Sequence, residues 1–400
     1  MSLPTTTRVV LTVGTQQFSY FTGVSVQRDL DQLSGRFRLQ CLDVARADAA
    51  LGGPRQVPTP LLNGAPATVA IDGETVLAGY IGRVDLTADA ERLNCTVGGL
   101  DRAGDLVRGA AFPKGPAEFH SIGLMAFAQK VCAPFGIYVK ADVGLGAPFT
   151  LLSTRPEQTG RDVLDMAARQ RSVLVTSDGL GGVVLTQGGI TRAPAPLWFG
   201  QNVESLTCSD DWSDRFSDYF VKGQTPGANG ARTATAPAIT HASAPTGDAT
   251  TENPGTAFDI EAQGVMMTGH AIDPQITRWL PTVRRPRSQS GSSSVQEQAE
   301  WMLRTSRGKS LQLHYRVLDW RDPASAVLWR PNQVTAVYDP YSGINGDMLI
   351  AGVDYQFSAR GRTTMLRVVP QGTYDLLATA DPVGSRIRDQ HAAARGGSTS

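Results

Sequence analysis

Apolar and polar residues alternate along much of the chain, and this period of two is typical of β-strands with one buried face. In the stretch 353–358, Val353, Tyr355 and Phe357 alternate with polar residues, and residues 365–369 continue as a further strand. The same pattern predicts strands at residues 7–13, 17–21, 23–29, 35–42, 67–71, 75–86 and 92–100. Asp72-Gly73 between two of these runs is a strong hairpin signal. Short strands with no helix between them predict a closed barrel or a sandwich.

The period changes near residue 103. Residues 121–131 and 159–171 carry apolar side chains at helical spacing, and a third helix is predicted at residues 295–307. His120, at the predicted start of the first helix, is interpreted as a residue of the capping region. Runs at 173–177 and 183–187 flank Asp178-Gly179 and predict a hairpin, so a small α/β unit follows the first strands.

The expected fold is mainly β with α/β insertions, and 400 residues are too many for one ordinary core. We expect one β-barrel at residues 1–103, a small α/β domain at 104–196 and a second barrel at 197–370. The second barrel is interrupted by a loop at 224–256 and by a helix-containing segment at 258–310, and residues 371–400 form a tail. Residues 224–256 lack large apolar side chains, so a flexible or extended arm is expected there.

Composition disfavours two classes of protein, nucleic-acid-binding proteins and membrane proteins. The formal net charge is zero, whereas a free-standing nucleic-acid-binding protein usually has a basic excess. The chain has no basic-then-apolar leader pattern, and no run approaches the ~20 apolar residues of a membrane span. We therefore expect folding in the cytoplasm and no contact with a membrane.

The sequence offers little support for catalysis, and no cofactor or metal is expected. Its four cysteines, Cys41, Cys95, Cys132 and Cys208, are far apart, which favours buried reduced thiols over a zinc site. The five histidines show neither HxH nor HExxH spacing, and no GxSxG motif is present. Three tryptophans are interpreted as core residues: Trp301, Trp320 and Trp329.

Two charged clusters are candidate interface sites. Asp210 and Asp211 lie in an acidic run without the order of a calcium-binding loop, and a solvated sheet edge is the simpler interpretation. Arg284, Arg285 and Arg287 form the densest basic cluster, which is either a solvated turn or a patch facing an interface or channel.

Several segments resemble, in the same order, the baseplate hub of contractile-tailed phages of the Mu type. They are VSVQRDLDQLSGRF at 24–37, AGYIGRV at 78–84, GLDRAGDLV at 99–107, CAPFGI at 132–137, FSDYFVKGQ at 216–224, AEW at 299–301, VLDWR at 317–321, LWRPNQVTAVYD at 328–339 and MLIAGVDY at 348–355. Leu100 and Arg108 depart from the family's pattern in the third segment. The resemblance covers most of residues 20–370.

The resemblance implies a structural protein that is no enzyme, with two tail-tube-type barrels in each chain. It implies a homotrimeric ring that adapts a hexameric tail tube to a trimeric central spike. The implied partners are the tube protein, the spike protein, the tape-measure protein and the baseplate wedge proteins, and DNA would pass through the lumen without specific binding. The implied location is the tail baseplate of the virion.

Two alternatives remain open at the level of sequence. One is the hub of a related contractile device, such as an R-type pyocin or a type VI-like spike base. The other is a tail-associated cell-wall hydrolase, which the missing catalytic constellations disfavour. Clearing of a peptidoglycan suspension would favour the hydrolase.

Overall fold

The computed structural model describes residues 9–19, 21–42, 63–88, 93–115, 118–171, 173–224, 266–285, 295–322, 324–358 and 361–374. The arm predicted at residues 224–256 lies outside this part of the chain except for its first residue, and so does the tail after Tyr374. No helix in the described ranges is long and apolar enough to cross a lipid bilayer.

The chain begins with strands, as the alternation predicts. They are β1 (Val9–Val13), β2 (Gln16–Phe18), β3 (Gly23–Asp29), β4 (Gln32–Leu42), β5 (Pro66–Ile71), β6 (Glu74–Ala88) and β7 (Leu93–Asp101). The predicted hairpin at Asp72-Gly73 joins β5 to β6, and both residues have positive φ (49° and 82°), as a tight two-residue hairpin turn requires.

A small α/β unit follows. Its elements are α2 (Gly104–Arg108), β8 (Glu118–Ile122), α3 (Leu124–Cys132), η1 (Ala133–Phe135), β9 (Tyr138–Ala141), β10 (Phe149–Ser153), α4 (Gly160–Arg169), β11 (Leu174–Ser177) and β12 (Gly182–Thr186). Thr159 begins α4 with a capping box, because its side chain accepts from the Asp162 N–H while Asp162 accepts from the Thr159 N–H. The first predicted helix was placed too early: α3 begins after Gly123, and His120 lies exposed in β8.

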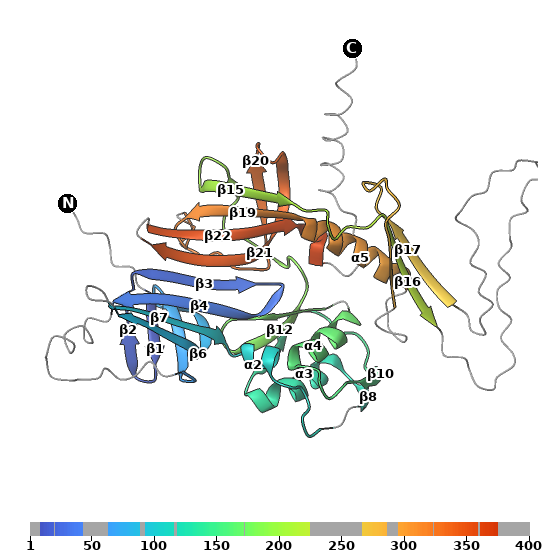
Figure 1. The fold of residues 1–400 in the computed structure, drawn as a ribbon, viewed down its shortest axis with the longest axis horizontal. Helices are drawn as coiled ribbons and strands as arrows, with labels where there is room; N and C mark the ends of the chain where they lie inside the picture. The colour runs from blue at the N-terminus through green and yellow to red at the C-terminus, as the bar shows by residue number, and fades with distance from the viewer. Residues whose placement is uncertain are drawn as a thin grey trace, which may run out of the picture.

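The remaining elements return to a mainly β arrangement. They are β13 (Thr191–Arg192), β14 (Leu197–Trp198), β15 (Val203–Asp210), β16 (Asp218–Gln224), β17 (Met266–Ile272), β18 (Pro281–Arg284), α5 (Val295–Ser310), β19 (Leu311–Leu318), β20 (Gln333–Asp339), β21 (Ile344–Ser358), β22 (Gly361–Pro370) and η2 (Gln371–Tyr374). In Figure 1, the β16–β17 pair extends beyond α5, away from the main sheet.

Most strands join one large sheet, with the order β15-β19-β22-β21-β3-β4-β7-β6-β5-β1-β2 and with β13, β14 and β20 attached beside β21. The prediction of a mainly β fold is therefore confirmed. The described strands close into no separate barrel, because β21 pairs with β3 and joins the two β regions (Figure 1). Residue alternation reports which face of a strand is buried but not which strand lies beside it, so the sequence did not reveal this joint.

The two β regions have the same strand order. Numbered along the chain, β3-β4-β7-β6-β5 in the first region corresponds to β15-β19-β22-β21-β20 in the second. The fourth strand of each set along the chain, β6 or β21, has 15 residues and contains an irregularity opposite the fifth strand, β7 or β22, between Ile81 and Arg83 or between Ile350 and Gly352. Each extra residue, Gly82 or Ala351, is a β-bulge that bends its strand.

Three of the four buried clusters of the described residues hold these parts together. One extends through both β regions and includes Trp320 and Trp329, as predicted for two of the three tryptophans. A second fills the α/β unit between its helices and strands. A third lies between α5 and the β16–β17 strands. The prediction of buried thiols is right for Cys95 and Cys132 and wrong for Cys208, which is exposed because it lies on the outermost strand β15.

Candidate assembly interface

The pairing of β21 with β3 joins the two β regions and is called the internal joint below. It shows how one set of strands binds another. Up to Ile350, β21 pairs with β20; after the bulge at Ala351 the same edge pairs with β3, from Gly352 opposite Asp29 to Phe357 opposite Val24. The Ala351 carbonyl accepts the Leu30 N–H at 2.8 Å, so the bulge is held by the β3–β4 turn. The joint is therefore an antiparallel strand pairing added to a shared apolar core.

An ion pair closes one end of this joint. The Arg367 guanidinium on β22 donates to Asp29 (2.9 Å) and to Asp31 (2.9 Å), and its side chain is 12% exposed. Burial alone would lower the pKa of Arg367, but its interactions with Asp29 and Tyr374 outweigh burial and raise that pKa, so the guanidinium stays charged. Arg367 is 338 residues from Asp29 and 336 from Asp31 in sequence, which is why no local pattern predicts these pairs.

A second polar contact ties the first strand set to the α/β unit. The buried Asp101 carboxylate accepts the Ser177 hydroxyl (2.7 Å) and the Gly35 N–H (2.9 Å). Burial raises the pKa of Asp101, although these hydrogen bonds oppose the shift. Arg28 is half-buried and donates to the Ser177 carbonyl at 2.9 Å, and desolvation lowers its pKa. These contacts fix β11 against β4.

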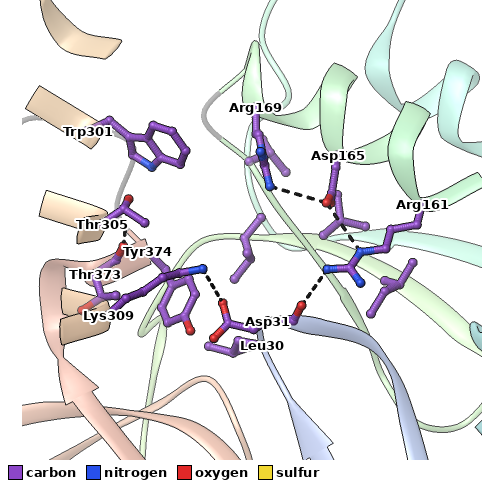
Figure 2. Close-up of a pocket in the computed structure, with 14 residues that line it drawn as sticks. Leu30, Asp31, Arg161, Asp165, Arg169, Trp301, Thr305, Lys309, Thr373 and Tyr374 are labelled. Atoms are coloured by element: carbon purple, nitrogen blue, oxygen red, sulfur yellow. Dashed lines mark hydrogen bonds and ion pairs between the residues drawn. The ribbon is translucent and has the colours of Figure 1, made fainter. Parts of the chain in front are cut away.

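A cavity of about 150 Å³ lies where the α/β unit, α5 and the β3–β4 turn meet, and Figure 2 shows the side chains that line it. Asp31 lies between two cations: its carboxylate pairs with Lys309 on α5 at 3.2 Å, and its carbonyl accepts from Arg161 on α4 at 2.7 Å. Asp165 pairs with Arg161 and Arg169 across the same wall. Most ionic groups at this junction are thus paired within the chain, which is typical of a structural contact.

The junction also carries Trp301, the third predicted core tryptophan. Its ring lines the cavity and is only partly buried, so the prediction of a core position is wrong for this residue. The Arg169 guanidinium lies 5.9 Å from the ring centroid, a distance suited to a cation–π contact. Trp301 lies where α5 meets the α/β unit. In the sequence it resembles a core residue, because it belongs to the apolar stripe of its own helix.

Asp273 joins α5 to the β16–β18 sheet. Its side chain is fully buried and accepts from Arg215 (2.6 Å) and Arg307 (2.6 Å), and the Gln275 N–H donates to it at 3.1 Å. Burial alone would raise the pKa of Asp273, but the hydrogen bonds from Arg307 and Arg215 outweigh it and hold that pKa below its usual value. Arg215 in turn lies over the Trp212 ring.

The pairing of Asp31 predicts an acid-sensitive junction. Burial opposes ionisation of Asp31, yet Lys309 and Arg367 outweigh burial and hold its pKa below the usual 3.8. A lowered carboxyl pKa contributes stability that is complete above the unfolded value and is lost as the pH falls through the folded value. We expect the melting temperature to differ between wild type and Asp31→Asn by a constant amount from about pH 7 to about pH 5 and to converge toward about pH 3.

Thermal melts at matched ionic strength measure this difference. Asp347→Asn serves as the control, because the Asp347–Arg192 pair is exposed (41% and 63%) and contributes little at any pH. A gap between wild type and Asp31→Asn that stays constant down to about pH 3 would contradict the role given to Asp31.

The structure separates the charged clusters proposed from sequence. Asp210 ends β15 and Asp211 follows it, and both are exposed on the outermost strand of the large sheet. Arg284 ends β18 and Arg285 follows it, both exposed, on the smaller sheet; Arg287 lies outside the described residues. The described His, Cys, Asp and Glu side chains form no group of three able to hold a metal ion.

The main sheet has strand edges that pair with nothing in the described part of the chain. The only named strand that β15 pairs with there is β19, apart from an isolated bridge between Val203 and Phe199, and after Gly82 the strand β6 pairs with β7 alone. Leu86 on that half of β6 is 47% exposed. Unpaired strand edges are templates for pairing with another chain. By contrast, Gln296 on α5 bonds both the N–H and the C=O of His270 and so blocks the outer edge of β17 there.

Comparisons with known proteins define the class first. The structure superimposes on the 43 kDa tail protein of prophage MuSo2 from Shewanella oneidensis with a TM-score of 0.73 and 26% identity, covering 92% of this chain and 99% of that one. It also matches the tail protein from Neisseria meningitidis MC58, with a TM-score of 0.72, 19% identity and coverage of 92% and 97%. The fold is thus that of a phage tail protein.

Sequence comparisons identify a family within this class of phage tail proteins. Three family models match successive parts of the chain: Mu phage baseplate assembly protein GpP-like, N-terminal (8–101); baseplate hub protein gp44-like, second domain (103–187); and Mu phage baseplate assembly protein GpP, fourth domain (291–377). Baseplate hub protein gp44 of Escherichia phage Mu is 29% identical over 335 residues, 82% of this chain and 78% of that protein.

The chain belongs to the Mu phage baseplate hub family, gp44/GpP, and the resemblance noted in the sequence is confirmed. It is a baseplate component of a Mu-like phage tail, in a family of structural proteins.

Proposed function

We propose that three copies of the chain form a ring that joins a hexameric tail tube to a trimeric central spike. The observation that carries this proposal is the repeated strand order, because one chain holds two strand sets of the same topology. Three chains then present six similar sets toward a six-fold tube while keeping three-fold symmetry toward a spike. In the ring each set serves as one tube-type unit of strands, the first within residues 1–103 and the second within about 197–370, around an α/β domain at 104–196.

In this proposal the ring closes through pairing of open sheet edges and apolar contacts between neighbouring copies. The outer surface meets the baseplate wedge proteins, and the central opening passes the tape-measure protein and then double-stranded DNA. Each phosphate neutralised by a lysine or arginine adds affinity through counterion release, so a passage should not bind phosphates tightly. A chain of zero net charge suits a neutral or acidic lumen, with Arg284, Arg285 and Arg287 away from its narrowest point or paired with acids.

The ring is tested by light scattering coupled to size exclusion. We expect a species of about 128 kDa, three times the 42.6 kDa of one chain, that dissociates to monomer on dilution. Cryo-electron microscopy of the purified particle then shows three-fold symmetry and the charge of the lumen. A dimer, a hexamer, or a lumen lined by unpaired arginines would overturn the proposal.

A further inference from the structure

The internal joint between β21 and β3 gives a template for a contact between copies. After its bulge, β21 pairs with β3, and the side chains that meet there are buried: Val353 is 1% exposed, Tyr355 2% and Val26 0%. In the repeated strand order, β6 corresponds to β21 and β15 corresponds to β3. Neither β6 after its bulge nor β15 has a strand on the matching edge among the described residues.

The residue equivalence follows from the pairing registers. Gly99 lies opposite Ile81, just before one bulge, and Val368 lies opposite Ile350, just before the other. On the far side of these strands, Phe37 pairs with Gly99 and Leu313 pairs with Val368. The next strand outward places Val26 opposite Phe37 and Cys208 opposite Leu313. Val26 in the first set therefore corresponds to Cys208 in the second.

The same alignment fixes the other strand. Leu86 lies the same number of residues after Ile81 as Tyr355 lies after Ile350, so Leu86 corresponds to Tyr355. Within the chain Tyr355 lies directly opposite Val26. The equivalent contact would place Leu86 directly opposite Cys208. One chain cannot make this contact with itself in the described arrangement, because β6 and β15 lie in different parts of the sheet (Figure 1).

We propose that β6 from Arg83 to Ala88 pairs antiparallel with β15 of a second copy, with Leu86 opposite Cys208. Burial supports this pairing. Leu86 is 47% exposed and Cys208 is exposed, whereas their counterparts at the internal joint, Tyr355 and Val26, are 2% and 0% exposed. The pairing would give both residues the environment that the internal joint already provides.

Charge and hydrogen bonding support the same register. Arg83 corresponds to Gly352 and comes opposite Asp211, which corresponds to Asp29. Arg83 is 78% exposed and, among the described residues, pairs with Asp85 of its own strand (2.6 Å), and Asp211 is exposed. At the internal joint the Ser25 hydroxyl donates to Asp354 at 2.9 Å, and the corresponding pair would be Thr207 and Asp85. Opposite charges across strands favour this register over a shifted one.

The occupant is a second copy because the two edges differ and complement each other. A contact between unlike surfaces of identical chains runs head to tail and closes into a ring when the rotation allows. This inference rests on the proposed ring and adds which strands and residues make its contacts. It also assigns a role to Asp210, the last residue of β15, and to Asp211 after it, which come opposite Val84 and Arg83 in this register.

Disulfide trapping tests the register. Residues directly opposite in an antiparallel pair have Cα atoms about 4.5–5.5 Å apart, within the range that a disulfide spans. Leu86→Cys is introduced together with Cys95→Ala, because Cys95 lies opposite Leu86 within the same chain and would compete. Under mild oxidation we expect covalent dimers and trimers on a non-reducing gel, formed through native Cys208. Adding Cys208→Ser should abolish them.

A shifted variant is the matched control. Asp85→Cys with Cys95→Ala places the thiol one residue away, on the other face of the strand, and should cross-link at least tenfold less. A trimer by light scattering without cross-linking through Cys208 would overturn this contact and leave the proposed ring standing. Monomers at every concentration without cross-links would overturn both.

Charge-reversal variants test the same strand register without the cysteine substitutions. Arg83→Asp and Asp211→Arg should each weaken association, by about tenfold, since each places like charges opposite one another. The double variant should restore most of the loss, with association measured by light scattering on dilution. Losses that simply add in the double variant would show that these residues do not face each other.

Discussion

Replacing Asp273 with alanine is expected to lower the free energy of unfolding by about 3–5 kcal/mol, the range for breaking a buried ion pair from one side. Asp273 and Arg215 have side chains 0% and 4% exposed, so removal of the carboxylate leaves a buried guanidinium without its counter-charge. Arg307 on α5 loses the same partner. Because this carboxylate links α5 to the β16–β18 sheet, we also expect α5 to separate from that sheet first. Urea unfolding measures the total loss, and hydrogen exchange locates it.

Asp347→Ala is the matched control for Asp273→Ala. Asp347 also binds an arginine, Arg192, at 2.7 Å, but both side chains are exposed. Its removal should cost less than about 1 kcal/mol, because water replaces the lost contact. Equal losses of unfolding free energy for the two variants would show that the buried pair at Asp273 stabilises the fold no more than the exposed pair does.

The second large effect is expected from Trp320→Ala, with a loss of about 3–5 kcal/mol. Trp320 is 0% exposed and lies in the cluster shared by both β regions. Its indole N–H donates to the Gln356 carbonyl at 2.9 Å, on the half of β21 that pairs with β3. The variant therefore leaves a cavity and also frees a carbonyl at the internal joint, so both β regions should lose stability together.

Trp279→Ala provides the comparison for Trp320→Ala. Trp279 is 72% exposed in the turn between β17 and β18, so the isolated chain should change by no more than about 0.5 kcal/mol. Chemical unfolding followed by far-ultraviolet circular dichroism measures both variants. A Trp320→Ala chain as stable as wild type would contradict the placement of this residue at the centre of the shared core.

Candidate residues for the interface were only partly accessible from the sequence. Asp210 and Asp211 were proposed as an edge, and they lie at the end of the outermost strand β15. Leu86 and Arg83 were missed, because in sequence Leu86 continues the apolar face of a strand and resembles any core residue. The basic cluster at Arg284 and Arg285 lies on the small sheet, and its role stays a prediction.

Local patterns determined the elements of this protein. Alternation located the strands of both β regions, Asp72-Gly73 marked a hairpin whose backbone has positive φ at both residues, and helical spacing at 159–171 located α4, which the structure shows to begin with a capping box. These features depend on residues close in sequence, where backbone geometry and capping act directly. The order of the family segments was also visible in the sequence.

Only the tertiary structure decided how the elements combine. The pairing of β21 with β3 merges the two β regions into one sheet, and the Arg367–Asp29 pair closes it across 338 residues. Partners from other elements bind the side chains of three aspartates and so connect separate parts of the fold: Asp31, Asp101 and Asp273. A period of two specifies which face of a strand is buried but leaves its neighbour open. That choice depends on the bulges at Gly82 and Ala351 and on long-range packing, which the sequence pattern does not record.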